Sequence, residues 1–157
     1  MNDPHLLYFE DIVAGARYDI KTTYKVSKEE IIAMASKWDP QPFHIDEEQA
    51  KSSIFGGLVA SSTHIFPIFC WLGQQGERNL AAASALGFDK IRLYAPVRPG
   101  DELSYYYTFI STRESSSRPG LGIVVAEGVI SNQLGEKIFT GEVASMVYKR
   151  PIVGGSN

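Results

Sequence analysis

The chain has 157 residues, of which 44% are hydrophobic and 21% charged, the composition of one ordinary globular domain. Its net charge is −3 and its acidic and basic residues are interspersed, so it lacks the basic patch or stripe of a nucleic-acid-binding protein. No cationic segment followed by an apolar run marks a signal peptide, and the longest nearly uncharged apolar run, 65–72, is too short to span a bilayer. We therefore expect a cytoplasmic protein that binds neither nucleic acid nor a membrane.

The first third of the chain predicts an N-terminal arm, a strand over 18–26 and a capped helix. Ser27 and Glu30 have the spacing of a capping box, and apolar residues at helical spacing follow them. This helix must end before Asp39, because Pro40 disfavours helical backbone at the residue that precedes it.

Two prolines shape the next segment. Pro42 restricts Gln41 in the same way that Pro40 restricts Asp39, so we predict that Asp39 and His44 lie on a rigid, extended loop and not on a helix. Asp46, with Gln49 three residues later, is expected to cap a short helix over about residues 47–52.

The most apolar segment predicts a long central helix over 59–75. Gly56 and Gly57 precede it and allow a turn that most residues could not adopt. Apolar residues lie on nearly every face of this helix, so we expect other parts of the protein, or a second subunit, to cover it on several sides. Pro67 is expected to kink it.

The second half of the chain predicts an antiparallel meander. Residues 79–87 are small and polar and indicate a loop or a frayed helix. Runs rich in β-branched and aromatic residues are separated by short turns, which is typical of antiparallel strands. These strands are expected at 90–94, 103–109, 122–131 and 137–148. The predicted fold is α+β: one domain, 1–157, with loose ends at 1–8 and 151–157, in which an antiparallel sheet wraps around the central helix.

Few residues of this chain could carry chemistry. The three histidines and one cysteine have no zinc-site spacing, and the sequence has no glycine-rich phosphate loop and no nucleophile elbow. Cys70 lies among apolar residues, which favours a core role over that of a catalytic thiol. Asp46 is explained by its capping pattern, and His64, on the first turn of the central helix, by packing.

Asp39 and His44 are the main candidates. A carboxylate can take a proton from water, and an imidazole titrates near neutrality, so together they could form an acid/base pair. The alternative is that Asp39 only stops a helix and that His44 is an ordinary loop residue. Unpaired backbone N–H groups at the start of the central helix, 60–63, could hold an oxyanion. Ser61 or Ser62 there could equally be a simple N-cap.

The chain resembles the MaoC-like acyl dehydratases, the family of the (R)-specific enoyl-CoA hydratases. The resemblance extends over about residues 9–148. It is carried by Asp39-Pro40-Gln41-Pro42-Phe43-His44, by Asp46 and Ala50, by Phe55-Gly56-Gly57-Leu58-Val59-Ala60-Ser61, and by Val97-Arg98-Pro99-Gly100-Asp101-Glu102-Leu103.

This resemblance implies a hot-dog fold and a homodimer or higher homo-oligomer, joined edge to edge, with active sites at the interface. It implies a hydro-lyase of fatty acid metabolism that hydrates a trans-2-enoyl-CoA, with Asp39 and His44 as the catalytic pair. Substrate binding would involve Gly57, Ser61 and Ser62, and a backbone N–H would stabilise the thioester oxyanion. The only coenzyme implied is the coenzyme A of the substrate, with no metal and no redox cofactor.

One residue departs from the pattern. The family usually has glycine at the position of Ser62, whose side chain would narrow the pocket or alter the turn. Ser62 keeps open a second function, that of a non-catalytic acyl-thioester binding or dimerisation module. A third function, that of a hot-dog acyl-CoA thioesterase, also stays open and would attack the carbonyl carbon.

Overall fold

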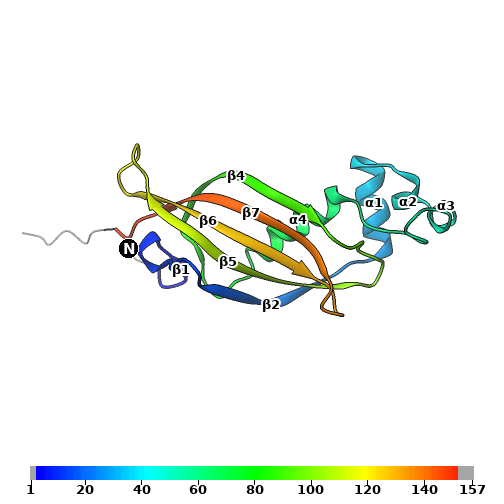
Figure 1. Cartoon of the computed structure of the whole chain (residues 1–157), viewed down its shortest axis with the longest axis horizontal. Coiled ribbons are helices and arrows are strands. Elements are labelled where there is room, and N and C mark those ends of the chain that lie inside the picture. The colour runs from blue at the N-terminus through cyan, green and yellow to red at the C-terminus, as the bar shows by residue number, and fades with distance from the viewer. Residues whose placement is uncertain (1–2, 152–157) are drawn as a thin grey trace, which may run out of the picture.

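The computed structural model describes residues 3–151 and consists of an antiparallel sheet with one α-helix packed along it and three further α-helices at one end (Figure 1). The strand order of the five-stranded sheet is β2-β5-β6-β7-β4. Its strands are β2 (Arg17–Lys25), β4 (Ala82–Leu93), β5 (Glu102–Glu114), β6 (Leu121–Ser131) and β7 (Lys137–Tyr148). The helices are α1 (Lys28–Trp38), α2 (Pro42–Ile45), α3 (Glu47–Lys51) and α4 (Ser62–Leu72).

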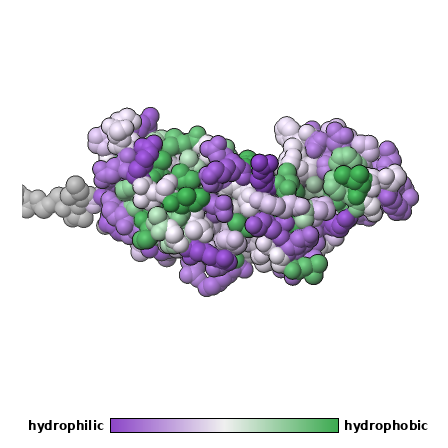
Figure 2. All heavy atoms as spheres, viewed as in Figure 1, coloured by the Kyte–Doolittle hydropathy of each residue, from purple (hydrophilic) through white to green (hydrophobic). Residues whose placement is uncertain are grey.

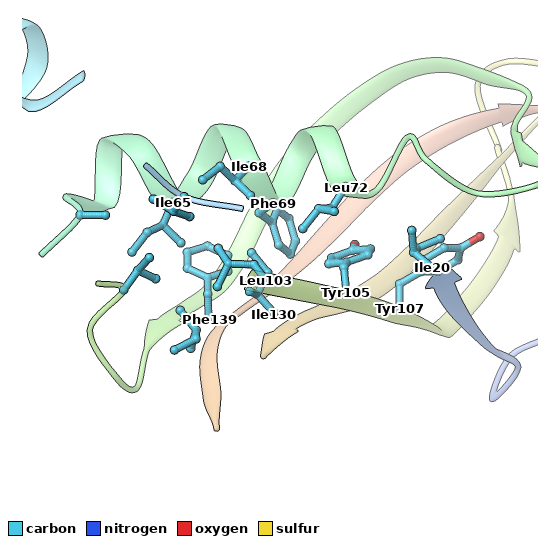
Figure 3. Packing of buried hydrophobic residues seen from close by; sticks show 14 of the residues in the cluster. Ile20, Ile65, Ile68, Phe69, Leu72, Leu103, Tyr105, Tyr107, Ile130 and Phe139 are labelled. Carbon is cyan, nitrogen blue, oxygen red and sulfur yellow. The ribbon is translucent and has the colours of Figure 1, made fainter. Parts of the chain in front are cut away.

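Side-chain alternation in the strands gives the sheet its buried face. Leu103, Tyr105, Tyr107 and Phe109 alternate along β5 and are all buried, so they share one face of the sheet. Figure 3 shows side chains of α4 pointing toward those of β5, β6 and β7. The labelled residues there are Ile20, Ile65, Ile68, Phe69, Leu72, Leu103, Tyr105, Tyr107, Ile130 and Phe139.

Helix α4 is shorter at both ends than the predicted 59–75, and at its start Val59 and Ala60 are not helical. Their N–H groups donate instead to the carbonyls of Phe43 (3.1 Å) and Val97 (2.9 Å). An eleven-residue helix spans about 16 Å, whereas a strand of thirteen residues such as β5 spans about 40 Å. The helix therefore covers only part of the sheet, and its outer side, with Pro67 and Trp71, is exposed within the single chain.

The segment predicted as a loop or a frayed helix, 79–87, instead contains strand β3 and the start of strand β4. Strand β3 (Asn79–Leu80) pairs in parallel with β1 (Leu6–Leu7), and β4 pairs antiparallel with β7 along its length. Small residues have weak strand propensity, but pairing with a neighbour decides the outcome here. Strand β4 forms one edge of the sheet and exposes several large apolar side chains. These are Leu86, Phe88, Ile91 and Leu93, with Tyr94 just beyond the strand, and they are 41–56% exposed.

The N-terminal arm is held in place, which corrects the prediction of a loose end over 1–8. Leu7 and Tyr8 are buried, and Leu7 accepts a hydrogen bond from the Ala81 N–H at 2.9 Å. A 3₁₀ helix, η1 (Phe9–Asp11), follows, and Asp11 forms ion pairs with Arg78 and Arg150. At the other predicted loose end, Pro151 is exposed and lies in no helix or strand, and Met1, Asn2 and 152–157 lie outside the described residues.

The surface of the protein carries both hydrophobic and hydrophilic areas. Figure 2 shows hydrophobic residues emerging over the sheet at the end away from α1, α2 and α3, with a smaller group at the helical end. Between residues 3 and 151, no helix has the length and apolar character that crossing a membrane requires.

Candidate active site

Asp39 lies at the end of helix α1, as predicted. Its N–H still donates to the Ala35 carbonyl at 2.9 Å, but its backbone has left the helical region, with φ −157° and ψ 71°. Pro40 follows directly, so the helix cannot continue. The Asp39 side chain is 29% exposed and can therefore reach both the protein and solvent.

His44 lies on a helix, which corrects the prediction of an extended loop. Gln41 is extended, as a residue before proline should be, but Pro42 occupies the first position of the one-turn helix α2. Proline suits that position because its missing N–H would have no partner there anyway. The prolines therefore restrict Asp39 and Gln41, while His44 is carried by the helix that Pro42 starts. The His44 ring packs edge-on against Phe43, at 4.5 Å between centroids.

The orientation of the His44 ring is fixed from one side. Its Nδ1 lies 2.6 Å from the Val59 carbonyl, which can only accept, so Nδ1 carries a hydrogen and donates it. In the neutral ring the lone pair then belongs to Nε2. This Nε2 lies 3.6 Å from Asp39 Oδ2, and the His44 side chain is 9% exposed.

Asp39 Oδ2 and His44 Nε2 are thus two hydrogen-bond acceptors that face each other. At 3.6 Å they are too far apart for a direct hydrogen bond. A water molecule placed between them could donate one hydrogen to Asp39 and the other to His44, leaving an oxygen lone pair free. The arrangement is suited to activating water by general base catalysis.

The segment that follows His44 in the sequence carries backbone N–H groups that could act as hydrogen-bond donors in the site. Gly56 has φ +65°, a conformation that glycine adopts without strain. Among the described residues, none accepts a hydrogen bond from the N–H of Gly57, Ser62 or Thr63. The last two are first-turn donors of α4, where the helix dipole also favours negative charge.

The two candidate serines have different surroundings. Ser61 is fully buried and occupies the N-cap position of α4, but its side chain makes no capping bond. Its hydroxyl instead shares a hydrogen bond of 2.7 Å with the Thr63 hydroxyl. Ser62 is exposed, so its side chain lies on the open side of the first turn.

Cys70 does not join the site. It lies on the C-terminal half of α4 beside an apolar cavity of about 360 Å³, and burial raises the pKa of its thiol. A raised pKa disfavours the reactive thiolate, in line with the predicted core role. The cavity is lined mainly by side chains of α4 and of the sheet, and neither Asp39 nor His44 reaches it. Its walls include Phe69, Gly73, Ala82, Ala85, Phe88, Tyr107, Val124 and Val143.

A second buried histidine has no good partner. His64 is 1% exposed, and neither ring nitrogen forms a hydrogen bond with any described residue. Its Nε2 lies 3.4 Å from Glu30 Oε1, which already accepts a hydrogen bond from the Tyr24 hydroxyl. Burial and this carboxylate raise the pKa of Tyr24 to about 12, so Tyr24 remains a donor at neutral pH. Burial lowers the pKa of His64 more than Glu30 raises it.

We expect His64 to make the protein less stable in mild acid. The pKa of His64 is lowered in the folded protein. In the unfolded chain His64 binds a proton below about pH 6.5, whereas in the folded chain it binds one only when the pH falls through the lowered pKa. Stability should decrease across that interval. In His64→Phe this part of the decrease disappears, as measured by urea unfolding midpoints between neutral and mildly acidic pH. His5→Phe, at an exposed histidine, is the control. Equal pH dependence in the wild type and His64→Phe would contradict the assignment.

Comparison with known proteins identifies the family. Residues 11–133 match the family model of the MaoC-like domain. The chain belongs to the MaoC-like family. It is 31% identical over 130 residues to the uncharacterised protein YdeM of Bacillus subtilis, a match that covers 80% of this chain and 88% of YdeM.

Two solved structures illustrate the likeness. A MaoC-like dehydratase from Rhodospirillum rubrum is 37% identical, with a TM-score of 0.84, and the match covers 93% of this chain and 99% of that one. The (R)-hydratase of A. caviae involved in PHA biosynthesis is 23% identical, with a TM-score of 0.67 and coverages of 90% and 99%. The predicted α+β hot-dog fold is confirmed, and membership of the MaoC-like family supports a hydratase or dehydratase activity in general terms.

Proposed function

We propose that this MaoC-like protein is a hydro-lyase that reversibly adds water to a trans-2-enoyl-CoA and forms a 3-hydroxyacyl-CoA. The observation that carries the proposal is the pair of acceptor atoms, Asp39 Oδ2 and His44 Nε2, 3.6 Å apart at a partly exposed site. Two acceptors facing one point suit a water that must be held by both hydrogens and attack with its oxygen.

In the proposed mechanism, Asp39 removes one proton from the water while His44 Nε2 accepts a hydrogen bond from the other hydrogen. The water oxygen bonds to C3, and the electrons of the double bond move toward the thioester, forming an enolate. Asp39 then returns the proton to C2. One water is added, the pair ends as it began, and dehydration follows the same steps in reverse.

The enolate oxygen requires hydrogen-bond donors. The unpaired N–H groups of Gly57, Ser62 and Thr63 are the candidates, because donors aimed at developing charge stabilise it strongly in a site that excludes water. Ser62 can donate through its backbone as glycine would. Its side chain would act on the shape of the acyl pocket, and Ser61 would support the turn from its buried position. Water addition of this kind requires only acid/base groups and oxyanion donors, so we propose no metal and no redox cofactor.

A homodimer would complete the site. Strand β4 is an unpaired edge with exposed apolar side chains, which supports edge-to-edge pairing with a second copy. Antiparallel pairing about a two-fold axis would set the Ala82 end of one β4 beside the Leu93 end of the other. Just beyond the Leu93 end, the Val97 carbonyl accepts from the Ala60 N–H at the start of α4.

Such pairing would bring the apolar cavity of one copy near the catalytic end of the other. Ala82, Ala85 and Phe88 of β4 belong to the cavity wall, so the cavity lies against this edge of the sheet. We propose that the acyl chain occupies it, and that the coenzyme A portion of the substrate remains outside.

The test is the loss of enoyl absorbance when the protein is added to crotonyl-CoA and to a longer trans-2-enoyl-CoA. The buffer contains no added metal, in keeping with the cytoplasmic, metal-independent enzyme that we propose. Formation of the 3-hydroxyacyl-CoA with at least one of them supports the proposal. Release of free thiol without hydration would indicate a thioesterase instead. Binding without either reaction would indicate a non-catalytic module, and both results would overturn the proposal.

A further inference from the structure

The turn between β4 and β5 contacts residues 55–60, which contain Gly56 and Gly57 and which we call the glycine segment. Arg98 lies on this turn, and its Nη2 donates to the Phe55 carbonyl at 2.7 Å. Phe55 directly precedes Gly56 and Gly57. Since a hydrogen bond from a charged donor is stronger than one between neutral groups, this contact restrains the start of the segment.

The turn itself is rigid. The backbone N–H of Arg98 donates to Asp101 Oδ2 at 2.7 Å, and Asp101 Oδ1 accepts from Gln133 Nε2 at 2.9 Å. Gly100, with φ +89°, donates its N–H to the Val26 carbonyl at 2.7 Å. The guanidinium of Arg98 therefore extends from a fixed base.

The guanidinium also lies close to Gly57. A Cβ atom added at Gly57 would lie 3.5 Å from Arg98 Nη1, so the charged group sits directly beside this backbone. On the other side, the Val97 carbonyl accepts from the Ala60 N–H at 2.9 Å. The same turn thus holds the glycine segment at Phe55 and at Ala60, and the unpaired N–H of Gly57 lies between these two points.

We propose that Arg98 is a positioning residue for the hydration reaction, which fixes the Gly56–Gly57 backbone so that the Gly57 N–H meets the thioester oxygen. This rests on the proposed function. Arg98 does not exchange a proton with the substrate in this role. It acts through the Phe55 carbonyl, and it explains why the Val97–Asp101 turn and the glycine segment belong to one site.

The alternative is that the exposed guanidinium binds a phosphate of coenzyme A. The two roles differ in their substrate dependence. A positioning residue affects all thioesters alike, whereas a phosphate ligand matters only for substrates that carry phosphate. An N-acetylcysteamine thioester of the same enoyl group lacks phosphate and separates the two.

The experiment compares Arg98→Ala with Arg113→Ala, a change at an exposed arginine of β5 whose side chain contacts no described residue through a hydrogen bond or ion pair. The first measurement is hydrogen exchange at the protected N–H groups of Gly56, Val59 and Ala60. We expect faster exchange there in Arg98→Ala only, with exchange in β6 unchanged. This readout needs no turnover, so it shows whether Arg98 fixes the Gly56–Gly57 backbone even if the wild-type protein hydrates nothing.

The second measurement is steady-state kinetics. Misplaced catalytic groups cost rate, so kcat should fall on the order of ten- to a hundredfold in Arg98→Ala, equally for the coenzyme A and N-acetylcysteamine thioesters. Unchanged exchange at residues 56–60, or a defect confined to the coenzyme A thioester and expressed in KM, would overturn the positioning role.

Discussion

Asp39→Asn is expected to lower kcat for enoyl-CoA hydration by about 10²–10⁴-fold and to leave the fold intact. An amide has the shape of the carboxylate but cannot take the proton from water. The Asp39 side chain is 29% exposed, and among the described residues its charge faces only His44, so little stability depends on it. The measurement is the loss of enoyl absorbance under saturating substrate, with circular dichroism to verify folding.

Asp46→Ala is the matched control for this prediction. Asp46 is a carboxylate of the same segment, but its oxygens accept from the Glu48 and Gln49 N–H groups and cap helix α3, as predicted from the sequence. Losing an N-cap costs about 0.5–2 kcal/mol of stability, with kcat nearly unchanged. If Asp39→Asn retained wild-type turnover, or if both variants lost activity alike, the proposed role of Asp39 would be wrong.

Gly128→Ala is expected to destabilise the protein by about 1–3 kcal/mol, although the change adds a single methyl group. Gly128 lies on β6 directly beneath the helix. An added Cβ would lie 2.3 Å from the Tyr105 hydroxyl oxygen and 2.6 Å from the Phe69 ring. Both rings belong to one packed cluster, in which Phe69 meets Tyr105 edge-on at 5.5 Å, so neither can move without disturbing its neighbours.

Gly87→Ala on β4 provides the comparison. Within the single chain, a Cβ added there meets nothing within 4 Å, and Gly87 has no positive φ. Its free energy of unfolding should stay unchanged or rise slightly, because alanine restricts the unfolded chain more than glycine does. Urea unfolding of both variants is the measurement. Equal midpoints for Gly128→Ala and the wild type would show that α4 packs less tightly on the sheet than the structure indicates.

The parts of the fold that could be predicted are those determined by neighbouring residues. Ser27 caps α1 by accepting from the Glu30 N–H, Pro40 ends that helix, and alternation on β5 identifies its buried face. The start of α4 and the strand character of 79–87 depend on partners far away in the sequence, namely the Val97 carbonyl for Ala60 and strand β7 for β4. Local patterns carry no information on such partners.

The candidate site also has parts that the local sequence predicts and parts that depend on distant residues. Asp39 and His44 could be selected from the sequence because their chemistry and spacing are unusual, and the structure brings them within 3.6 Å. The predicted extended loop at His44 is wrong because Pro42 has two effects: it keeps Gln41 extended, and it also starts helix α2. The contact of Arg98 with Phe55 joins segments 43 residues apart, and no local pattern could have indicated it.

Val59 shows how part of a site can persist while its side chains vary. Its N–H and its C=O both bind the α2 segment, the first to the Phe43 carbonyl and the second to His44 Nδ1. Both atoms belong to the main chain, so any buried apolar residue that fits at this position would keep the same imidazole tautomer. The protonation pattern of the histidine is thus inherited with the path of the backbone, and an inventory of side chains would never reveal it.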